Sequence, residues 1–537
     1  MLDRPLEWIA APHIPLDFRG PTDRAFTPFG DPAHAQPMIE RLGRVGARRA
    51  DHSAVIDDAG TLTYGQLLRQ VARLTAAIAQ HEAAIGPVGI LLPIGRAYVV
   101  AVYACLAARR LAVMLDAEHP SERNAAMIGA TDVKLLLTSG PGMASVAEVS
   151  ALALEPLDNV GPLPVAGLDS ARELLDVDAP AFILCTSGST GAPKAIVHSQ
   201  RNLLHMARTG HDGFHFGEDD RLLALSSPAA LGGLAPLLHV PLTGATLQLL
   251  NLKARGISGL FSDLQRYPIS ILGAAPSLLR GLSRLPAAGA AFASTRIEQT
   301  YGEPLTRDDV RLLRTVLPAK CDIRNGYGAT EAGGMSWFAQ VDDEHDPIRI
   351  AAGAPMPDTE AALIDADGAP CAAGEVGELV FRSRYAALDE YVGGQPLPGS
   401  QQRDPDDASR RIYRTGDLAR HDGNGVFVVL GRADRMININ GQRTEPAEIE
   451  AVLLRQQEVE QAEVIVQQRN ESAALTAFIV AHEGAAAGLQ TRLRAALRQA
   501  LPRHMVPARI ILLDQLPRLP GGKLDAQALR MLAGGDA

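Results

Sequence analysis

Two glycines, two serines and two threonines come directly before a single lysine in the segment LCTSGSTGAPKAIVHS, residues 184–199. Glycine leaves backbone amides accessible, and amides, hydroxyls and an ammonium group together suit the oxygens of a polyphosphate. The segment follows an apolar run, so we expect a phosphate-binding loop after a strand. Its expected phosphate contacts are Thr186, Ser187, Gly188, Ser189, Thr190, Gly191 and Lys194.

The spacing of this loop argues against a P-loop NTPase. A Walker A motif needs Gly-Lys followed by Ser or Thr and then a helix, whereas Lys194 follows Pro193 and precedes Ala195. Considered alone, the loop could equally be a polar surface turn, because Ser, Gly and Pro clusters are common in loops. The choice between these readings depends on motifs elsewhere in the chain.

Six further motifs accompany the loop. They are LTYGQL (62–67), LAARRLAVMLDAEHPSER (106–123), NGYGATEAG (325–333), YRTGDLAR (413–420), GRADRMININGQRTEPAEIE (431–450) and LPRLPGGKLDAQAL (516–529). Together with the loop they resemble the adenylate-forming superfamily, which includes acyl-CoA synthetases, adenylation domains of nonribosomal peptide synthetases and firefly luciferase. The resemblance covers nearly the whole chain beyond an N-terminal arm.

The resemblance implies a nucleotide site. Glu331 would bind the Mg²⁺ that bridges ATP oxygens, which is a task for a hard oxygen ligand, and Tyr327 would cover the adenine. Asp417 would accept both ribose hydroxyls with its two oxygens, and Arg432 would contact the nucleotide. Singly, each would be an ordinary loop, packing or surface residue. The resemblance adds Gly302, Glu303, Pro304, Asn325 and Gly326 to this site, and Thr330 to the catalytic groups.

The resemblance also implies a mobile catalytic lysine. Lys523 would reach the carboxylate and the α-phosphate, where a cation offsets the repulsion between two anions, and Asp434 would be the hinge of the small domain. The implied reaction first forms an acyl-adenylate and pyrophosphate from ATP and a carboxylate. A thiol of phosphopantetheine or CoA then displaces AMP, and the anhydride requires a site that excludes water.

The acid that is activated is expected to lack an α-ammonium group. Amino-acid-activating relatives place an Asp before the segment PLTGATL, but no acid occurs between Arg221 and Ser262, and an unpaired buried ammonium would cost several kcal/mol. We therefore expect an aryl, fatty or other simple acid. The expected pocket consists of Leu231, Gly232, Ala235, Gly273, Gln299, Tyr301, Gly326, Gly334 and Met335. Its small residues leave room for a bulky tail, and Gln299 and Tyr301 could hydrogen-bond a polar substituent.

The thiol acceptor is expected to be a separate carrier protein of secondary metabolite biosynthesis. The segments GQRTEPAEIE and YRTGDLAR resemble stand-alone peptide-synthetase adenylation enzymes, and only fourteen residues follow Lys523. Asn438 and Asn440 stand where peptide-synthetase relatives often carry Lys and Arg, so positive charge that could contact the phosphate of phosphopantetheine or CoA is lost. Gly441 of the same loop is retained. Ala329 stands where the family commonly has Pro. Free CoA is the alternative acceptor.

Two other functions remain open. An amino acid could be the substrate if an acid reached the pocket from another segment. A non-catalytic nucleotide-binding scaffold is the alternative of a different class, but a degenerate scaffold would be expected to have lost some of the charged positions. All of them are filled, by Lys194, Glu331, Asp417, Arg432 and Lys523.

Length and composition indicate a soluble protein of at least two domains. The chain has 537 residues, 47% of them hydrophobic and 21% charged. A net charge of −10 argues against nucleic-acid or anionic-lipid partners. The sequence shows neither a membrane span nor a signal peptide, so a cytoplasmic location is expected. The four cysteines suggest packing rather than zinc or disulfides; Cys185 should be a small apolar residue at a strand end.

The pattern of apolar runs predicts an α/β protein. We expect an extended surface arm up to about residue 35, a helix over 62–80 and short strands of a parallel sheet. That helix should bury the stripe Leu67, Leu68, Val71, Leu74 and Ile78. The strand segments are VGILLPI, LAVML, DVKLLLT, AFILCT, RLLALSS and ATLQLL.

A change of pattern predicts a small α+β domain at the C-terminal end. We expect a large N-terminal domain over 1–430, a hinge at 431–434 and a small domain over 435–537, with helices near 445–456 and 489–501 and three strands. The Gly- and Pro-rich insert at 393–409 is expected to be a mobile surface loop.

Overall fold

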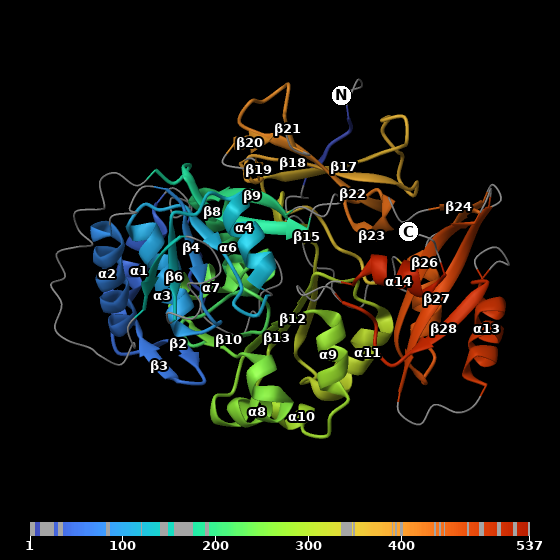
Figure 1. Cartoon of the computed structure of the whole chain (residues 1–537), viewed down its shortest axis with the longest axis horizontal. Helices are drawn as coiled ribbons and strands as arrows, with labels where there is room; N and C mark the ends of the chain where they lie inside the picture. Colours follow the sequence, from blue (N-terminus) through green and yellow to red (C-terminus); the bar gives the residue numbers. More distant parts are fainter. Residues whose placement is uncertain are drawn as a thin grey trace.

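Three β-sheets and a smaller C-terminal unit make up the computed structural model (Figure 1). The structure describes residues 6–10, 26–30, 36–81, 86–119, 121–139, 149–154, 176–187, 193–334, 346, 349–388, 390–392, 395–397, 401–433, 437–439, 442–444, 446–469, 472–482, 488–501, 506–518 and 524–534.

The first sheet has eight strands in the order β20-β19-β9-β8-β5-β4-β6-β7. The strands from β8 to β7 are parallel, as the uninterrupted apolar runs predict, whereas β9, β19 and β20 are added in antiparallel fashion. The strands are β4 (Val88–Leu91), β5 (Ala112–Met114), β6 (Leu135–Thr138), β7 (Ser150–Ala153), β8 (Pro180–Ser187), β9 (Pro193–Ser199), β19 (Glu390–Val392) and β20 (Gln395–Leu397).

The second sheet has seven strands in the order β14-β13-β12-β10-β11-β2-β3. All its pairs are parallel except the β2–β3 hairpin. The strands are β2 (Ser53–Asp57), β3 (Gly60–Thr63), β10 (Arg221–Ala224), β11 (Thr246–Leu249), β12 (Ile271–Ala274), β13 (Ile297–Tyr301) and β14 (Asp322–Gly326).

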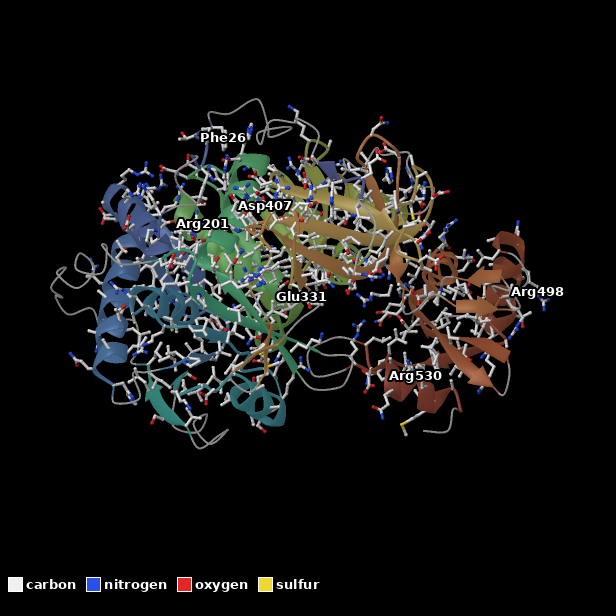
Figure 2. The ribbon with its side chains drawn as sticks, turned by 90° about the horizontal axis from the view of Figure 1, so that it is seen from above. Phe26, Arg201, Glu331, Asp407, Arg498 and Arg530 are labelled. Carbon is white, nitrogen blue, oxygen red and sulfur yellow. The ribbon has the colours of Figure 1, made fainter. Side chains whose placement is uncertain are left out.

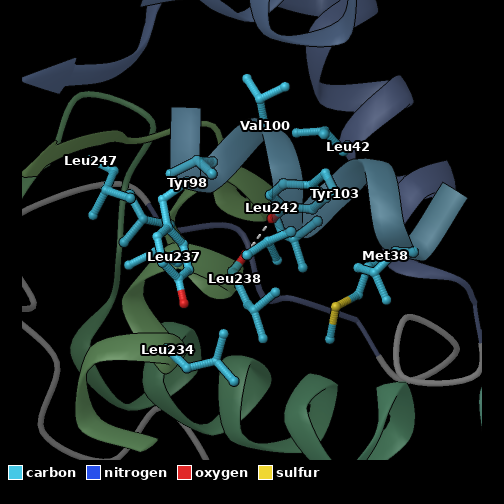
Figure 3. Close-up of a cluster of buried hydrophobic side chains, with 14 of the residues drawn as sticks. Met38, Leu42, Tyr98, Val100, Tyr103, Leu234, Leu237, Leu238, Leu242 and Leu247 are labelled. Atoms are coloured by element: carbon cyan, nitrogen blue, oxygen red, sulfur yellow. Dashed lines mark hydrogen bonds between the residues drawn. The ribbon is translucent and has the colours of Figure 1, made fainter. Parts of the chain in front are cut away.

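A layer of helices joins the first two sheets in one apolar core. It consists of α1 (Met38–Arg48), α2 (Tyr64–Gln80), α3 (Arg96–Ala107), α6 (Gln200–Phe214) and α7 (Leu231–Thr243). After Arg96, helix α3 is apolar on all sides, and all of its residues except Ala97 are buried. Figure 3 shows its Tyr103 hydroxyl donating to the Leu238 carbonyl of α7 at 2.7 Å, which satisfies a polar group inside the core.

Helix α2 confirms the prediction for residues 62–80. It begins at a capping box in which Thr63 and Gln66 bond each other's main chain. Four of the five predicted stripe residues are buried, and Leu68 packs against the core while half-buried.

Other helices cover the outer faces of the two sheets. Helix α4 (Ser121–Ala130) packs on the first sheet. The second sheet is covered by α8 (Leu252–Arg266), α9 (Pro276–Ser283), α10 (Ala288–Ala291) and α11 (Arg307–Val316). Among the described residues, no helix is long and apolar enough to cross a membrane.

The third sheet is antiparallel and was not predicted. Its order is β1-β17-β18-β22-β21, with β23 paired to β22. The strands are β1 (Ile9–Ala10), β17 (Thr359–Ile364), β18 (Gly377–Ser383), β21 (Gln401–Arg403), β22 (Arg411–His421) and β23 (Phe427–Arg432). The prediction of a surface loop over 393–409 is wrong in part, because β20 and β21 lie there. The insert is also anchored by Asp404, a buried residue that accepts from Arg382 at 3.3 Å.

The two described pieces of the N-terminal arm, residues 6–10 and 26–30, contact the rest of the protein. Strand β1 pairs with β17 at the edge of the third sheet. Phe29 is buried: its main-chain N–H donates to Asp212 at 2.7 Å, and the Arg41 guanidinium lies 3.4 Å from its ring centroid. Hydrogen bonding and cation–π contact therefore fix this segment on α6.

The C-terminal unit has the predicted helices and strands. Its helices are α12 (Pro446–Leu454), α13 (Leu489–Ala500) and α14 (Ala526–Leu532), and its sheet consists of β26 (Val459–Arg469), β27 (Ser472–Ala481) and β28 (Arg509–Leu513). A separate hairpin, β24 (Ile437–Ile439) with β25 (Gln442–Thr444), precedes them. The two apolar clusters of this unit draw only on residues after 448. The exact domain boundary and the hinge stay predictions.

Candidate active site

The predicted phosphate loop lies between two antiparallel strands. Strand β8 pairs with β9, with Thr186 opposite Lys194 and Ser187 opposite Pro193. A strand therefore precedes the loop, as predicted, and another strand follows it. Lys194 is half-buried on β9. Residues 188–192 of the loop lie outside the described part of the chain.

The carboxyl ends of β13 and β14 meet in register, with Tyr301 opposite Gly326. Beyond β13, the carboxylate of Glu303 accepts from the Ser277 main chain at 3.0 Å and from its hydroxyl at 2.9 Å, where α9 begins. The buried amide of Asn325 donates to the carbonyls of Ile350 and Ala351 at 3.2 and 3.1 Å. Glu303 is therefore hydrogen-bonded to the start of α9, and Asn325 is hydrogen-bonded to the segment at residues 350–351.

Tyr327 and Asp417 meet although 90 residues separate them. The hydroxyl of Tyr327, just after β14, donates to Asp417 Oδ2 on β22. Burial, together with the Asp417 carboxylate, raises the pKa of the Tyr327 phenol well above its usual value. The phenol therefore stays protonated and acts as a donor, which fixes its ring relative to the third sheet.

Arg432 joins this pair from the neighbouring strand. Strand pairing places Arg432 of β23 opposite Asp417 of β22, and its Nη1 lies 3.6 Å from Asp417 Oδ1 and donates to the Thr415 carbonyl at 2.8 Å. Gly416 has φ +68°, and a Cβ there would lie 2.8 Å from Arg432 Nη2. Glycine is thus required twice, by the backbone conformation and by the close approach of the guanidinium.

Glu331 lies beside the same cluster. Burial raises the pKa of Tyr413 on β22, and so do the charge of the Glu331 carboxylate and a hydrogen bond to it. The negative charge of Asp417 raises the same pKa further. Figure 2 shows Glu331 near the middle of the molecule, away from Arg498 on α13 of the C-terminal unit. Next to it, Thr330 faces His198 of β9, whose pKa burial lowers to about 4. The structure thus brings Tyr327, Glu331, Asp417 and Arg432 together from two sheets.

The ring of Tyr301 lies between two of the predicted pocket glycines. A Cβ on Gly232 of α7 would lie 2.8 Å from Tyr301 Cε2, and a Cβ on Gly273 of β12 would lie 3.4 Å from Cε1. The Tyr301 hydroxyl hydrogen-bonds Ser226 at 3.0 Å. Burial raises the pKa of Tyr301 to about 12.

The other predicted pocket residues surround this ring in part. Gln299 lies two residues before Tyr301 on the same side of β13, and its half-buried amide has no hydrogen-bond partner among the residues that the structure describes. Leu231 and Ala235 are half-buried on α7, while Gly334 lies on the short hairpin of β15 (Gly328–Ala329) and β16 (Gly333–Gly334). Met335 lies outside the described residues.

Three polar residues near this pocket were missed by the sequence analysis. Ser227, beside Ser226, donates to Oδ2 of Asp116, and Oδ1 of Asp116 accepts from the Glu118 main chain at 2.8 Å. Asp116 was not predicted, because it lies outside residues 221–262, the segment in which an acid was expected for an amino-acid substrate. The signal was available, because Asp116 follows β5 and the two serines follow β10, and ligands bind at the carboxyl ends of such strands.

Several predicted residues cannot be placed. Lys523 and Asp434 lie outside the described part of the chain, as do the loop residues Gly188, Ser189, Thr190 and Gly191. The side chains of Asn438 and Asn440 are likewise not described. Cys185 is buried within β8, and burial raises the pKa of its thiol to about 12, in agreement with a packing role.

Comparison with known proteins gives two family models and many relatives. The model described as AMP-binding enzyme matches residues 42–389, and the model described as AMP-binding enzyme C-terminal domain matches 448–523. The chain is 30% identical over 505 residues to the probable non-canonical nonribosomal peptide synthetase CymA of Salinispora arenicola, and 30% identical over 509 residues to tyrocidine synthase 3 of Brevibacillus parabrevis. These matches cover 90% and 92% of this chain but only 6% and 8% of the relatives.

Solved structures share the fold. A four-domain nonribosomal peptide synthetase bound to AMP and glycine matches with a TM-score of 0.80 at 24% identity, over 92% of this chain and 36% of that one. The anthranilate CoA ligase AuaEII in complex with anthranoyl-AMP matches with a TM-score of 0.77 at 20% identity, over 93% and 97% of the two chains. With the family models spanning most of its length, the chain belongs to the AMP-binding enzymes, the adenylate-forming superfamily that its motifs resemble.

Proposed function

We propose that the protein uses ATP to activate a carboxylic acid and then passes the acyl group to a thiol. A carboxylate oxygen attacks the α-phosphorus, a P–O bond forms, and the bond to the β-phosphate breaks as pyrophosphate leaves. A thiolate sulfur then attacks the acyl carbon, and AMP leaves with the electrons of the broken C–O bond. Membership of the AMP-binding enzyme family supports this reaction class.

The observation that carries the proposal is the cluster of Tyr327, Asp417 and Arg432. Asp417 contacts Tyr327 through Oδ2 and Arg432 through Oδ1, and because a carboxylate oxygen can accept more than one hydrogen bond, its two oxygens suit the two hydroxyls of a ribose diol. The Tyr327 ring, held by its hydroxyl, offers a flat face to adenine. The side chain of Arg432 is 49% exposed, so a nucleotide bound at Asp417 could reach its guanidinium group.

Glu331 is assigned to the magnesium ion that accompanies ATP. A carboxylate is a hard oxygen donor, and Mg²⁺ is commonly held by one or two carboxylates and by substrate phosphates, so the residue fits the group. The ion neutralises phosphate charge when bound. Thr330 and Lys194, with the loop before it, are assigned to the same phosphates, and Lys523 to the carboxylate and the α-phosphate. Asp434 is assigned to the hinge that delivers Lys523.

The pocket around Tyr301 is assigned to the acid. Its aromatic ring and two glycines offer a flat apolar slot, and Ser226 and the amide of Gln299 supply polar groups. No acid occurs from Arg221 to Ser262, and Asp116, the carboxylate that contacts the neighbouring Ser227, is held by Ser227 and by the Glu118 main chain. We therefore assign an aryl, fatty or other simple acid rather than an α-amino acid.

The acceptor is assigned to the phosphopantetheine thiol of a separate carrier protein, supported by relatives that are peptide synthetases. Free CoA is the alternative, since a structural neighbour is named as a CoA ligase. Trapping the labelled acyl group on CoA or on a holo-carrier protein separates the two.

The experiment that tests the proposal is acid-dependent exchange of labelled pyrophosphate into ATP with a panel of acids. We expect exchange with aryl or aliphatic acids to exceed exchange with α-amino acids. Strong preference for an amino acid would contradict the substrate assignment, and that activity should then fall in Asp116→Asn. Absence of exchange with every acid would contradict the proposed reaction itself.

A further inference from the structure

A cavity of about 310 Å³ lies between α9 and α11 of the large part and α12 and β26 of the C-terminal unit. Its volume is at the lower end of the range for small-molecule sites. No residue assigned to ATP or to the acid lines it. The cavity is therefore separate from the proposed active site.

Arginines dominate the lining of this cavity. Five arginines face three carboxylates, which leaves an excess of positive charge. The arginines are Arg280, Arg284, Arg307, Arg311 and Arg455, and the carboxylates belong to Asp308, Asp309 and Glu460.

Two of these arginines pair with carboxylates that also line the cavity. Arg280 pairs with Asp309 at 2.6 Å and Arg311 with Asp308 at 2.5 Å. Arg307 donates to the main-chain carbonyl of Asp346 at 2.7 Å.

The other two arginines come from opposite walls. Arg284, just after α9, donates to Nε2 of His482 at 2.8 Å, and an imidazole ring supplies no negative charge. Arg455, just after α12, is exposed and has no partner among the residues that the structure describes. Guanidinium groups from both units therefore face one cavity with spare donors.

From this arrangement we infer that the cavity binds a phosphate-bearing anion of at least two negative charges and that the bound anion links the C-terminal unit to α9 and α11. Planar guanidinium groups match phosphate oxygens with paired hydrogen bonds, which favours phosphates over monovalent anions. Two sources share this chemistry: inorganic pyrophosphate and a nucleotide bisphosphate such as the 3′-phosphate end of CoA. The inference does not rest on the proposed function, because binding requires no turnover.

The test is calorimetric titration at low salt with pyrophosphate and with adenosine 3′,5′-bisphosphate. All proteins carry Lys194→Ala, so that binding at the proposed nucleotide loop is weakened. Arg284→Ala and Arg455→Ala should each weaken binding about tenfold or more, because each removes charged hydrogen bonds. Arg498→Ala, an exposed arginine of α13 away from the cavity, is the matched control and should bind like the parent.

The outcomes are distinct. Loss of affinity in both cavity variants, with the Arg498→Ala control unchanged, supports the site, and the tighter of the two probes identifies the source. Parent-like affinity in both cavity variants, no binding in the Lys194→Ala parent, or equal loss in the control would overturn the inference. Since all three arginines are exposed, thermal unfolding should confirm that each variant is folded.

Discussion

Replacing Gly232 by alanine tests the geometry of the acid pocket. The new Cβ would lie 2.8 and 2.9 Å from Cε2 and Cδ2 of Tyr301, closer than carbon atoms pack. The ring cannot turn away freely, because it is half-buried, hydrogen-bonded to Ser226 at 3.0 Å and in contact with Gly273 on its other side. A shift of the ring or of α7 is then unavoidable.

The magnitude follows from two opposing effects. Overpacking a buried site costs about 1–3 kcal/mol, whereas alanine in place of a helical glycine contributes at most about 1 kcal/mol in favour. We expect the free energy of unfolding to fall by about 1–2 kcal/mol. Because the ring would be pressed into the pocket, the KM for the acid should rise more than kcat falls.

Urea unfolding and pyrophosphate exchange measure these two effects. Gly210→Ala in α6 is the matched control, since its Cβ would meet nothing closer than Phe214 at 3.9 Å, and it should be neutral or stabilising. The double variant Gly232→Ala/Tyr301→Val should be more stable than Tyr301→Val alone, because the new Cβ then no longer meets the tyrosine ring. The reasoning fails if Gly232→Ala is as stable as the control and keeps the same KM.

Three further changes have defined outcomes. Asp417→Ala should weaken ATP binding about tenfold or more, since it removes charged hydrogen bonds; unchanged affinity by calorimetry would refute the ribose assignment. Lys523→Ala should depress adenylate formation far more than ATP binding, and equal losses would remove its assigned role. Glu298→Gln should stabilise the protein more at pH 8 than at pH 5. Burial raises the pKa of Glu298 well above its usual value and leaves both oxygens without a partner among the described residues. Protonation of this carboxyl therefore stabilises the folded state below the pKa of the unfolded chain, and this contribution to stability is lost as pH rises from that value to the folded pKa. If urea unfolding gave the same difference in free energy of unfolding between variant and parent at pH 5 and pH 8, the result would contradict this reasoning.

The parallel strands of the first two sheets could be predicted, because a strand that is buried on both faces consists of consecutive apolar residues. Uninterrupted apolar runs such as FILC and LLAL are short and are bounded by Gly, Pro or Ser, which favours buried strands over buried helix segments. The apolar stripe of residues 67–78 likewise predicted the helix α2 and its buried face. The third sheet has short strands mixed with charged motif residues, and its role as a frame for Asp417 and Arg432 could not be inferred from periodicity.

The motifs identified individual site residues but not their contacts. That Tyr327 donates to Asp417 depends on packing between two sheets and on the register of β22 with β23. In the same way, the sequence suggested small pocket residues, yet the ring of Tyr301 between Gly232 and Gly273 appears only when α7 lies on β12 and β13. Long-range register and side-chain packing are cooperative properties that a linear pattern does not contain.

A crystal structure with a non-hydrolysable ATP analogue and Mg²⁺ tests the central claim most directly. We expect both ribose hydroxyls on the oxygens of Asp417, adenine against the Tyr327 ring and the metal beside Glu331. A nucleotide bound elsewhere, with these three side chains unoccupied, would contradict the account.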